Sequence, residues 1–205
     1  SGSRGKYNIS SQSNPYFLFP ELYNFRYNIY SSEWPVTNRL VELYLQRKSD
    51  NNGWEREING ISNNEKANLL MERYSFKELL SDVEHRDLLN NTISLKGYCL
   101  FAPAEVNMGV SLFRDSLYAL LERNEFRNMR FENLLDTLGM ISGADIRAGI
   151  SGWDRPTPLP FYTIGQPEVI KITNKGQESF VLKQLVSNNS DRDGMLQLDI
   201  QAGGY

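Results

Sequence analysis

Histidine and cysteine are nearly absent from this chain of 205 residues, which has one of each, His85 and Cys99. Zinc sites use several His, Cys or carboxylate ligands, and the common hydrolytic triads use a histidine as the base. A His-rich metal site within the chain is therefore excluded, and most hydrolase chemistry is disfavoured. One cysteine cannot form an internal disulfide. We expect His85 to be a solvated surface residue and Cys99 to be a small buried hydrophobe.

A strong charge of one sign and long apolar runs are also missing. The net charge of −3 gives no long-range attraction to nucleic acid, so we predict no nucleic-acid partner. No apolar run approaches the length of a bilayer crossing, so we predict no membrane span. The chain does have 40% hydrophobic and 12% aromatic residues, which is enough for a core.

Hydrophobic periodicity predicts helices through much of the region before Trp153. Ser75 suits an N-cap between two of them, and Gly143 suits a C-terminal stop. The predicted helices are Glu33–Lys48, Glu65–Tyr74, Phe76–Val83, Pro103–Arg123 and Phe131–Ile141. Apolar residues at helical spacing in the last two predict one shared core, made of Val106, Phe113, Leu117, Phe131, Leu134 and Leu138.

The composition changes after Trp153, where three prolines in residues 154–160 exclude a helix. Three short strands are predicted beyond them, at Val169–Thr173, Ser179–Val186 and Met195–Ile200, with turns at 174–176 and 190–194. Such strands bury little alone, so they must dock on the helices or belong to a larger sandwich.

The sequence therefore predicts a mainly α fold, a multi-helix domain with a short C-terminal β appendage (α+β). We predict a tag or linker at 1–5, a helical domain at 6–153, and a linker with a β-rich segment of a β-sandwich at 154–205. The oligomeric state stays open.

Two surface features each allow two interpretations. Residues 16–30 are rich in Tyr, Phe and Asn, and they either form a recognition surface or pack down as an aromatic cover. Arg123, Arg127 and Arg130 either bind an anion or, with the glutamates around them, form a mixed solvated face.

Several motifs from Thr92 onward occur in a familiar order. They are ISLKGYCLF, LLERNEF, RFENLLDTLG, SGADIRAGISGW and PLPFY. Their order resembles the helical half of the aminopeptidase N-like gluzincin metallopeptidases. In that family an extended "Y-x-K-G" segment leads into a helix, a "fenl"-type helix follows, and then come "sG-d…W…P" and a β module. The resemblance implies a peptidase-like fold, a peptide or protein partner, and a place in a cell-envelope or extracytoplasmic protein.

The family's zinc site is degenerate in this sequence. Its HExxH motif corresponds best to residues 20–24 (PELYN), where Glu21 fits the general base but Pro20 and Asn24 replace both histidines. Its second motif, N-E-G-x-x-x-Y, falls on residues 38–44, where Arg39 replaces the third ligand. A cation at that position repels a metal.

The oxyanion position differs as well. Lys96 and Gly97 match the "K-G" pair, but Ser94 replaces the tyrosine that would stabilise the oxyanion. We therefore assign no catalytic residue, no metal and no cofactor. The Lys-Gly pair also fits a simpler interpretation, in which the glycine allows close helix packing.

The resemblance implies that a degenerate cleft remains and binds a peptide or protein. Arg39 would hold a carboxylate there, either Glu21 or a peptide C-terminus, or else it is a solvated helix residue. The candidate binding residues are Glu21, Tyr23, Arg39, Ser94 and Lys96.

The leading hypothesis is a non-catalytic, peptidase-like binding or scaffolding module of a larger protein. One alternative is the C-terminal part of an active zinc aminopeptidase whose ligands lie outside this chain. The other is a purely structural helical domain.

Overall fold

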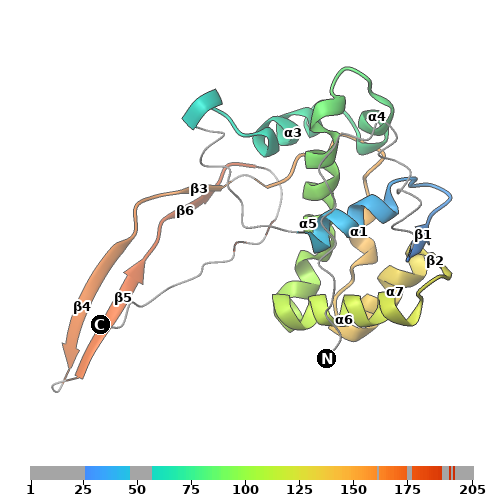
Figure 1. The fold of residues 1–205 in the computed structure, drawn as a ribbon. Helices are drawn as coiled ribbons and strands as arrows, with labels where there is room; N and C mark the ends of the chain where they lie inside the picture. The colour runs from blue at the N-terminus through green and yellow to red at the C-terminus, as the bar shows by residue number, and fades with distance from the viewer. Residues whose placement is uncertain are drawn as a thin grey trace. The chain divides into compact units, whose positions relative to one another are not determined.

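The computed structural model of the chain describes residues 26–46, 57–160, 162–174 and 177–190, together with Gly194 and Leu196. Helices precede a C-terminal β ribbon (Figure 1), which confirms the predicted fold class, mainly α with a C-terminal β appendage. The chain divides into two compact units, which we describe separately. Unit 1 comprises residues 1–51 and 93–151, and unit 2 comprises residues 52–92 and 152–205.

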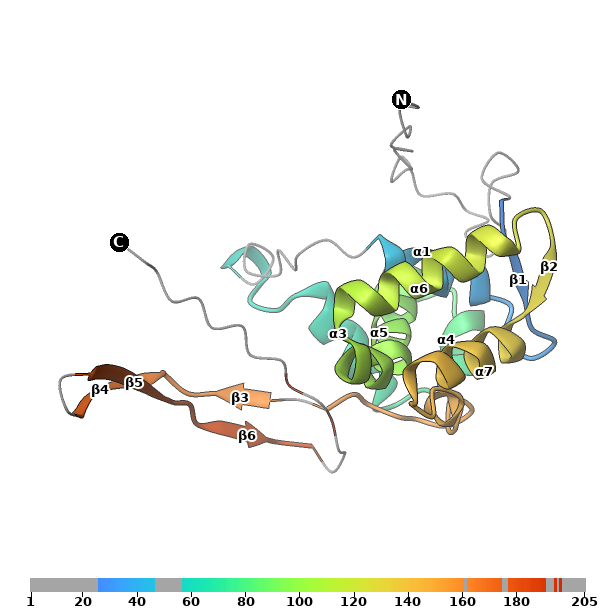
Figure 2. The same ribbon diagram turned by 90° about the horizontal axis from the view of Figure 1, so that it is seen from below.

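Unit 1 is mainly helical. Its helices are α1 (Thr37–Leu45), most of α5 (Leu89–Met108), α6 (Val110–Arg123) and α7 (Phe131–Ser142), followed by a short 3₁₀ turn, η3 (Arg147–Ile150). Two three-residue strands, β1 (Asn28–Tyr30) and β2 (Asn128–Arg130), pair in parallel beside them (Figures 1 and 2). As predicted, α7 ends at Gly143, whose φ of +69° is the left-handed conformation that favours glycine.

The core of unit 1 brings together side chains from all four helices. The ring of Tyr44 lies 4.7 Å from that of Phe101 and 5.9 Å from that of Phe113. The predicted shared core is confirmed for its fully buried members, which are Phe113, Leu117, Phe131, Leu134 and Leu138. It is wrong for Val106, whose side chain is 67% exposed.

The prediction of one helix over Pro103–Arg123 is wrong. Helix α5 begins at Leu89 and continues through Pro103 to Met108, and Gly109, with φ +84°, separates it from α6. A glycine tolerates that backbone conformation and ends the first helix. Residues 92–101, which the gluzincin resemblance expects to contain an extended segment, therefore lie within a helix.

Cys99 is exposed on α5, which corrects the expectation that it is buried. Helix geometry supplies the reason. Gly97 and Phe101 are buried, and each is about 200° around the helix from position 99 at 100° per residue. The neighbouring protein still desolvates the thiol and raises its pKa, while the charge of Lys96 lowers it.

Unit 2 begins with two short helices, α3 (Asn63–Met71) and α4 (Phe76–Ser81), followed by the 3₁₀ turn η2 (Arg86–Leu88) and the first residues of α5. The predicted N-cap at Ser75 is confirmed. Its hydroxyl accepts the Glu78 N–H at 3.2 Å, and the Glu78 carboxylate accepts the Ser75 N–H at 2.7 Å. Ser62 and Glu65 form the same reciprocal capping box on α3.

The β appendage is an antiparallel ribbon. β3 (Tyr162–Ile164) pairs with β6 (Val186–Asn188), and β4 (Glu168–Asn174) pairs with β5 (Gln177–Lys183) (Figures 1 and 2). The first two predicted strands are thus present, although the second is interrupted at residues 184–185. The third, Met195–Ile200, lies outside the described residues apart from Leu196.

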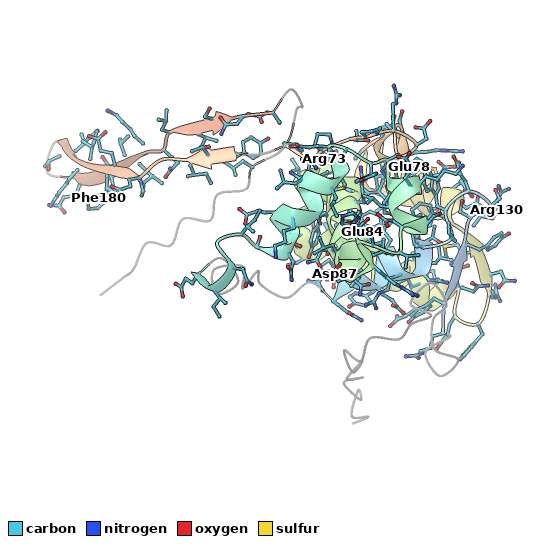
Figure 3. All side chains as sticks on the ribbon, turned by 90° about the horizontal axis from the view of Figure 1, so that it is seen from above. Arg73, Glu78, Glu84, Asp87, Arg130 and Phe180 are labelled. Atoms are coloured by element: carbon cyan, nitrogen blue, oxygen red, sulfur yellow. The ribbon has the colours of Figure 1, made fainter. Side chains whose placement is uncertain are left out.

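The chain just before the ribbon is attached to the short helices of unit 2. The Trp153 ring packs edge-on against Phe76 at 5.0 Å, and Leu159 exchanges two hydrogen bonds with the Asn68 side chain. The ribbon itself exposes large apolar side chains, such as Phe180 on β5 (Figure 3). The predicted domain limits stay predictions. No helix in the described part of the chain combines the length and hydropathy of a membrane span.

Candidate functional site

Three of the five predicted binding residues lie in the described part of unit 1, whereas Glu21 and Tyr23 lie outside the described residues. Arg39 is on α1, and Ser94 and Lys96 are on α5. The two helices meet where Leu40 of α1 contacts Gly97 of α5. Arg39 precedes Leu40, and Ser94 is one helical turn before Gly97. The structure therefore places Arg39 and Ser94 on adjoining helices.

Arg39 pairs with a carboxylate of its own helix. Its Nη1 donates to Glu42 Oε2 at 3.2 Å, and both side chains are partly exposed. Residues three apart on a helix are neighbours, and such exposed pairs contribute little stability. The guanidinium carries five N–H donors in a planar arrangement that can hold a carboxylate through two parallel hydrogen bonds.

Ser94 and Lys96 differ in their surroundings. Ser94 is half-buried, whereas the Lys96 side chain is only 4% exposed. A lysine can bury its methylene stem while its ammonium group finds polar partners. The neighbouring Gly97 is mid-helix, and a Cβ there would stand 3.2 Å from Leu40 Cγ. The Lys-Gly pair therefore includes the close-packing glycine that its simpler interpretation expects.

His85 belongs to unit 2 and lies at its surface with a side chain that is 27% exposed, where it pairs with Asp82. Its Nδ1 lies 2.6 Å from Asp82 Oδ2, and the pair fixes the segment between α4 and η2. Hydrogen bonding to Asp82 raises the pKa of His85, and the same bond lowers the pKa of Asp82. Glu84 lies within this segment and Asp87 follows it in η2 (Figure 3), and the negative charges of both also raise the pKa of His85.

Side chains that could hold a metal are not clustered in the described residues. No group of three or more His, Cys, Asp or Glu side chains is placed to bind an ion within those ranges. Residues 20–24, where the resemblance locates two of the ligand positions, lie outside them.

Sequence reasoning missed Phe126, which lies in the turn between α6 and β2 of unit 1. Phe126 has a positive φ of +59° and a side chain that is 79% exposed. Two neighbouring arginines are paired, Arg26 Nε with Glu125 Oε1 at 2.6 Å and Arg130 Nε with Glu132 Oε2 at 3.4 Å (Figure 3 labels Arg130). These ion pairs agree with the mixed, solvated face that was one interpretation of the arginine cluster. No pattern in the sequence marks Phe126, because its backbone angle depends on a distant contact.

Glu132 is held in place at the first turn of α7. Its Oε1 accepts the Ser31 hydroxyl at 2.9 Å. Burial alone would raise the pKa of this carboxyl, but hydrogen bonds from its own backbone N–H and from Ser31, together with the charge of Arg130, lower it overall. The negative charge of a carboxylate at a helix N-terminus is also attracted to the positive end of the helix dipole. Glu132 therefore stabilises the end of the β1–β2 pair.

Comparison of the chain with protein-family models, with curated proteins and with solved structures finds no match.

Proposed function

We propose that this chain is a non-catalytic, peptidase-like domain that binds a protein or peptide partner as a module of a larger protein. The observation that carries the proposal is Arg39. It occupies the position that the gluzincin resemblance assigns to the third zinc ligand, and it lies partly exposed on α1 beside α5, where it pairs with Glu42.

The chemistry of Arg39 favours binding over metal catalysis. A guanidinium stays protonated at any physiological pH and repels a divalent cation, whereas it forms paired hydrogen bonds with carboxylates. A peptide C-terminus offers such a carboxylate. Ser94, on the adjoining helix, provides a hydroxyl that can donate to or accept from a peptide backbone.

The first experiment tests for catalysis. The full chain is incubated with zinc and with aminoacyl p-nitroanilides and short peptides, and zinc content is measured after dialysis. We expect substoichiometric zinc and no release of amino acids. One zinc per chain together with zinc-dependent hydrolysis would instead support the active-aminopeptidase alternative.

The second experiment tests for binding. A fluorescein-labelled peptide library is titrated with the full chain, once with free C-termini and once with amidated C-termini. We expect the free C-termini to bind more tightly and R39Q to remove that preference, because the charged acceptor is lost. R73Q, a change at an exposed arginine of unit 2, is the matched control. Equal affinity for both libraries would contradict the proposal and favour the purely structural domain.

A further inference from the structure

The turn between α6 and β2 presents an aromatic ring on a backbone that bulky residues seldom adopt. Phe126 has φ +59°, and among the described residues it is the one non-glycine residue with a positive φ. Glycine or asparagine would fit this backbone more easily, and a polar side chain would suit its exposure. Costly conformations of this kind concentrate where a side chain is used for contact.

The turn is fixed from both sides. The Phe126 N–H donates to the Arg26 carbonyl at 2.8 Å, and the Arg127 N–H donates to the Asn124 carbonyl at 3.0 Å. The Arg26–Glu125 ion pair joins the same two segments. The ring is thus presented on a pre-organised backbone, which lowers the entropy lost when it binds a partner.

Two arginines of the turn are available to a partner. Arg123 and Arg127 are exposed, and neither takes part in an ion pair within the described residues. Arg26 and Glu125 neutralise each other in their ion pair, and Arg123 and Arg127 outnumber the exposed Glu122, so the turn has a net positive charge although the chain as a whole is negative. An exposed aromatic ring beside arginines is the composition typical of interface hot spots.

We propose that Arg123, Phe126 and Arg127, which we name the Phe126 surface, bind a segment of a partner protein that presents an apolar side chain flanked by carboxylates. The apolar side chain packs on the Phe126 ring, and the carboxylates pair with the two arginines. This proposal goes beyond the peptide binding suggested for Arg39 and does not depend on any peptidase-like ancestry.

The test titrates the full chain, observed by NMR, with a short synthetic peptide that has a central tryptophan among glutamates and aspartates. Two counterpart peptides replace either the acidic residues with lysine or the tryptophan with alanine. We expect saturable shifts of the amides of residues 122–127 with the acidic tryptophan peptide. Each counterpart should bind at least about tenfold more weakly, because it lacks one of the two contacts.

Variants separate the ring from the stability of the turn. F126G removes the ring and also relieves the positive φ, so it should fold at least as well as the wild type and yet lose at least about tenfold in affinity. The double variant R123Q/R127Q should lose the preference for acidic peptides. M140A is the matched control, because Met140 is an exposed apolar residue on α7 of the same unit.

Four results would overturn the proposal. The first is the absence of saturable shifts, and the second is an unchanged affinity in F126G. The third is that amides 16–25 are protected from hydrogen exchange in the wild type and lose that protection in F126G. The chain's own N-terminal segment would then be what covers the Phe126 surface. The fourth is a homodimer that F126G dissociates in sedimentation, which would make a second copy the occupant.

Discussion

Leu40 of α1 and Gly97 of α5 are in such close contact that a Cβ at position 97 would stand 3.2 Å from Leu40 Cγ. This contact positions Arg39 and Ser94 on adjoining helices. A valine at 97 would have to displace Leu40, and overpacking of this kind costs about 1–3 kcal/mol. We therefore expect G97V to lower the free energy of unfolding by about that amount, as measured by urea denaturation.

A double-mutant cycle isolates this contact. Leu40 is fully buried, and L40A should cost about 2–5 kcal/mol because it leaves a cavity. In G97V/L40A the valine occupies part of that cavity, so the double variant should be more stable than the sum of the two changes predicts by about 1 kcal/mol or more. Strict additivity would mean that the two side chains do not meet.

The aromatic core of unit 1 gives a second prediction. F113A should lower the free energy of unfolding by about 3–5 kcal/mol, because the ring is fully buried against Tyr44 and Phe101. V106A is the control, since Val106 is exposed, and it should stay within about 0.5 kcal/mol of the wild type. If the two variants had equal denaturation midpoints, the assignment of the buried faces would be refuted.

The amphipathic helices could be predicted from the sequence because each has a polar, solvent-exposed face opposite its buried apolar face. Phe131, Leu134 and Leu138 recur at helical spacing on α7, and the polar residues between them make the period visible. Ser75 and Glu78 predict a helix start because the capping box is a local motif that spans only four residues.

Helix α5 could not be placed in the same way. The buried residues Ile93, Leu100 and Ala104 share one helical face, but Lys96 lies on the buried side while Cys99 and Val106 are exposed, so the hydrophobic period is weak. Pro103 also resembles a helix start. Gly109 was the available signal for the break. Within the candidate site, the pairing of Arg39 with Glu42 could be predicted from their spacing of three residues on a helix.

The conformation of Phe126 lay beyond sequence reasoning altogether. It is held by the carbonyl of Arg26, far away along the chain, and no local pattern encodes such a contact. Positions of this kind become visible only when the tertiary structure brings two segments together.

The His85–Asp82 pair gives a prediction about pH. The folded-state pKa of His85 is raised above its ordinary value of 6.5. The stability that protonated His85 contributes is therefore fully present below pH 6.5 and is lost as the pH rises through the raised pKa. The pKa of Asp82 is lowered below its ordinary 3.8, so its contribution is present above that value and is lost as the pH falls through the lowered pKa. The pair should stabilise its segment most between these two ordinary values.

Hydrogen exchange of amides 82–88 measures this effect in the full chain. H85Q should expose the segment at pH 5 to 6, below the ordinary pKa of histidine, and should differ less from the wild type once the pH exceeds the raised pKa of His85 and the imidazole is neutral. K77Q changes an exposed charge on α4 and serves as the control. A difference that is independent of pH would show that packing of the imidazole, rather than its charge, holds the segment.

The last predictions concern how the β segment depends on the helices of unit 2. The Trp153 ring is nearly fully buried beside Phe76, and the Lys77 N–H donates to the Trp153 carbonyl at 3.4 Å. W153A should lower the stability of unit 2 by about 3–5 kcal/mol and increase hydrogen exchange through residues 153–159. F180A removes an exposed ring from β5 and should change neither quantity.

The same contacts predict the behaviour of residues 154–205 expressed alone. Within β3 to β6 each strand pairs with one other strand, and Val169, Phe180 and Leu185 of this ribbon are exposed. The ribbon therefore buries too little apolar surface to be stable without the contacts that join residues 153–159 to the helices of unit 2. The fragment should show no cooperative thermal transition by circular dichroism and fast amide exchange throughout. A cooperative melt of the isolated fragment would mean that it holds a core of its own, and Trp153 would then be a point of attachment rather than the source of its stability.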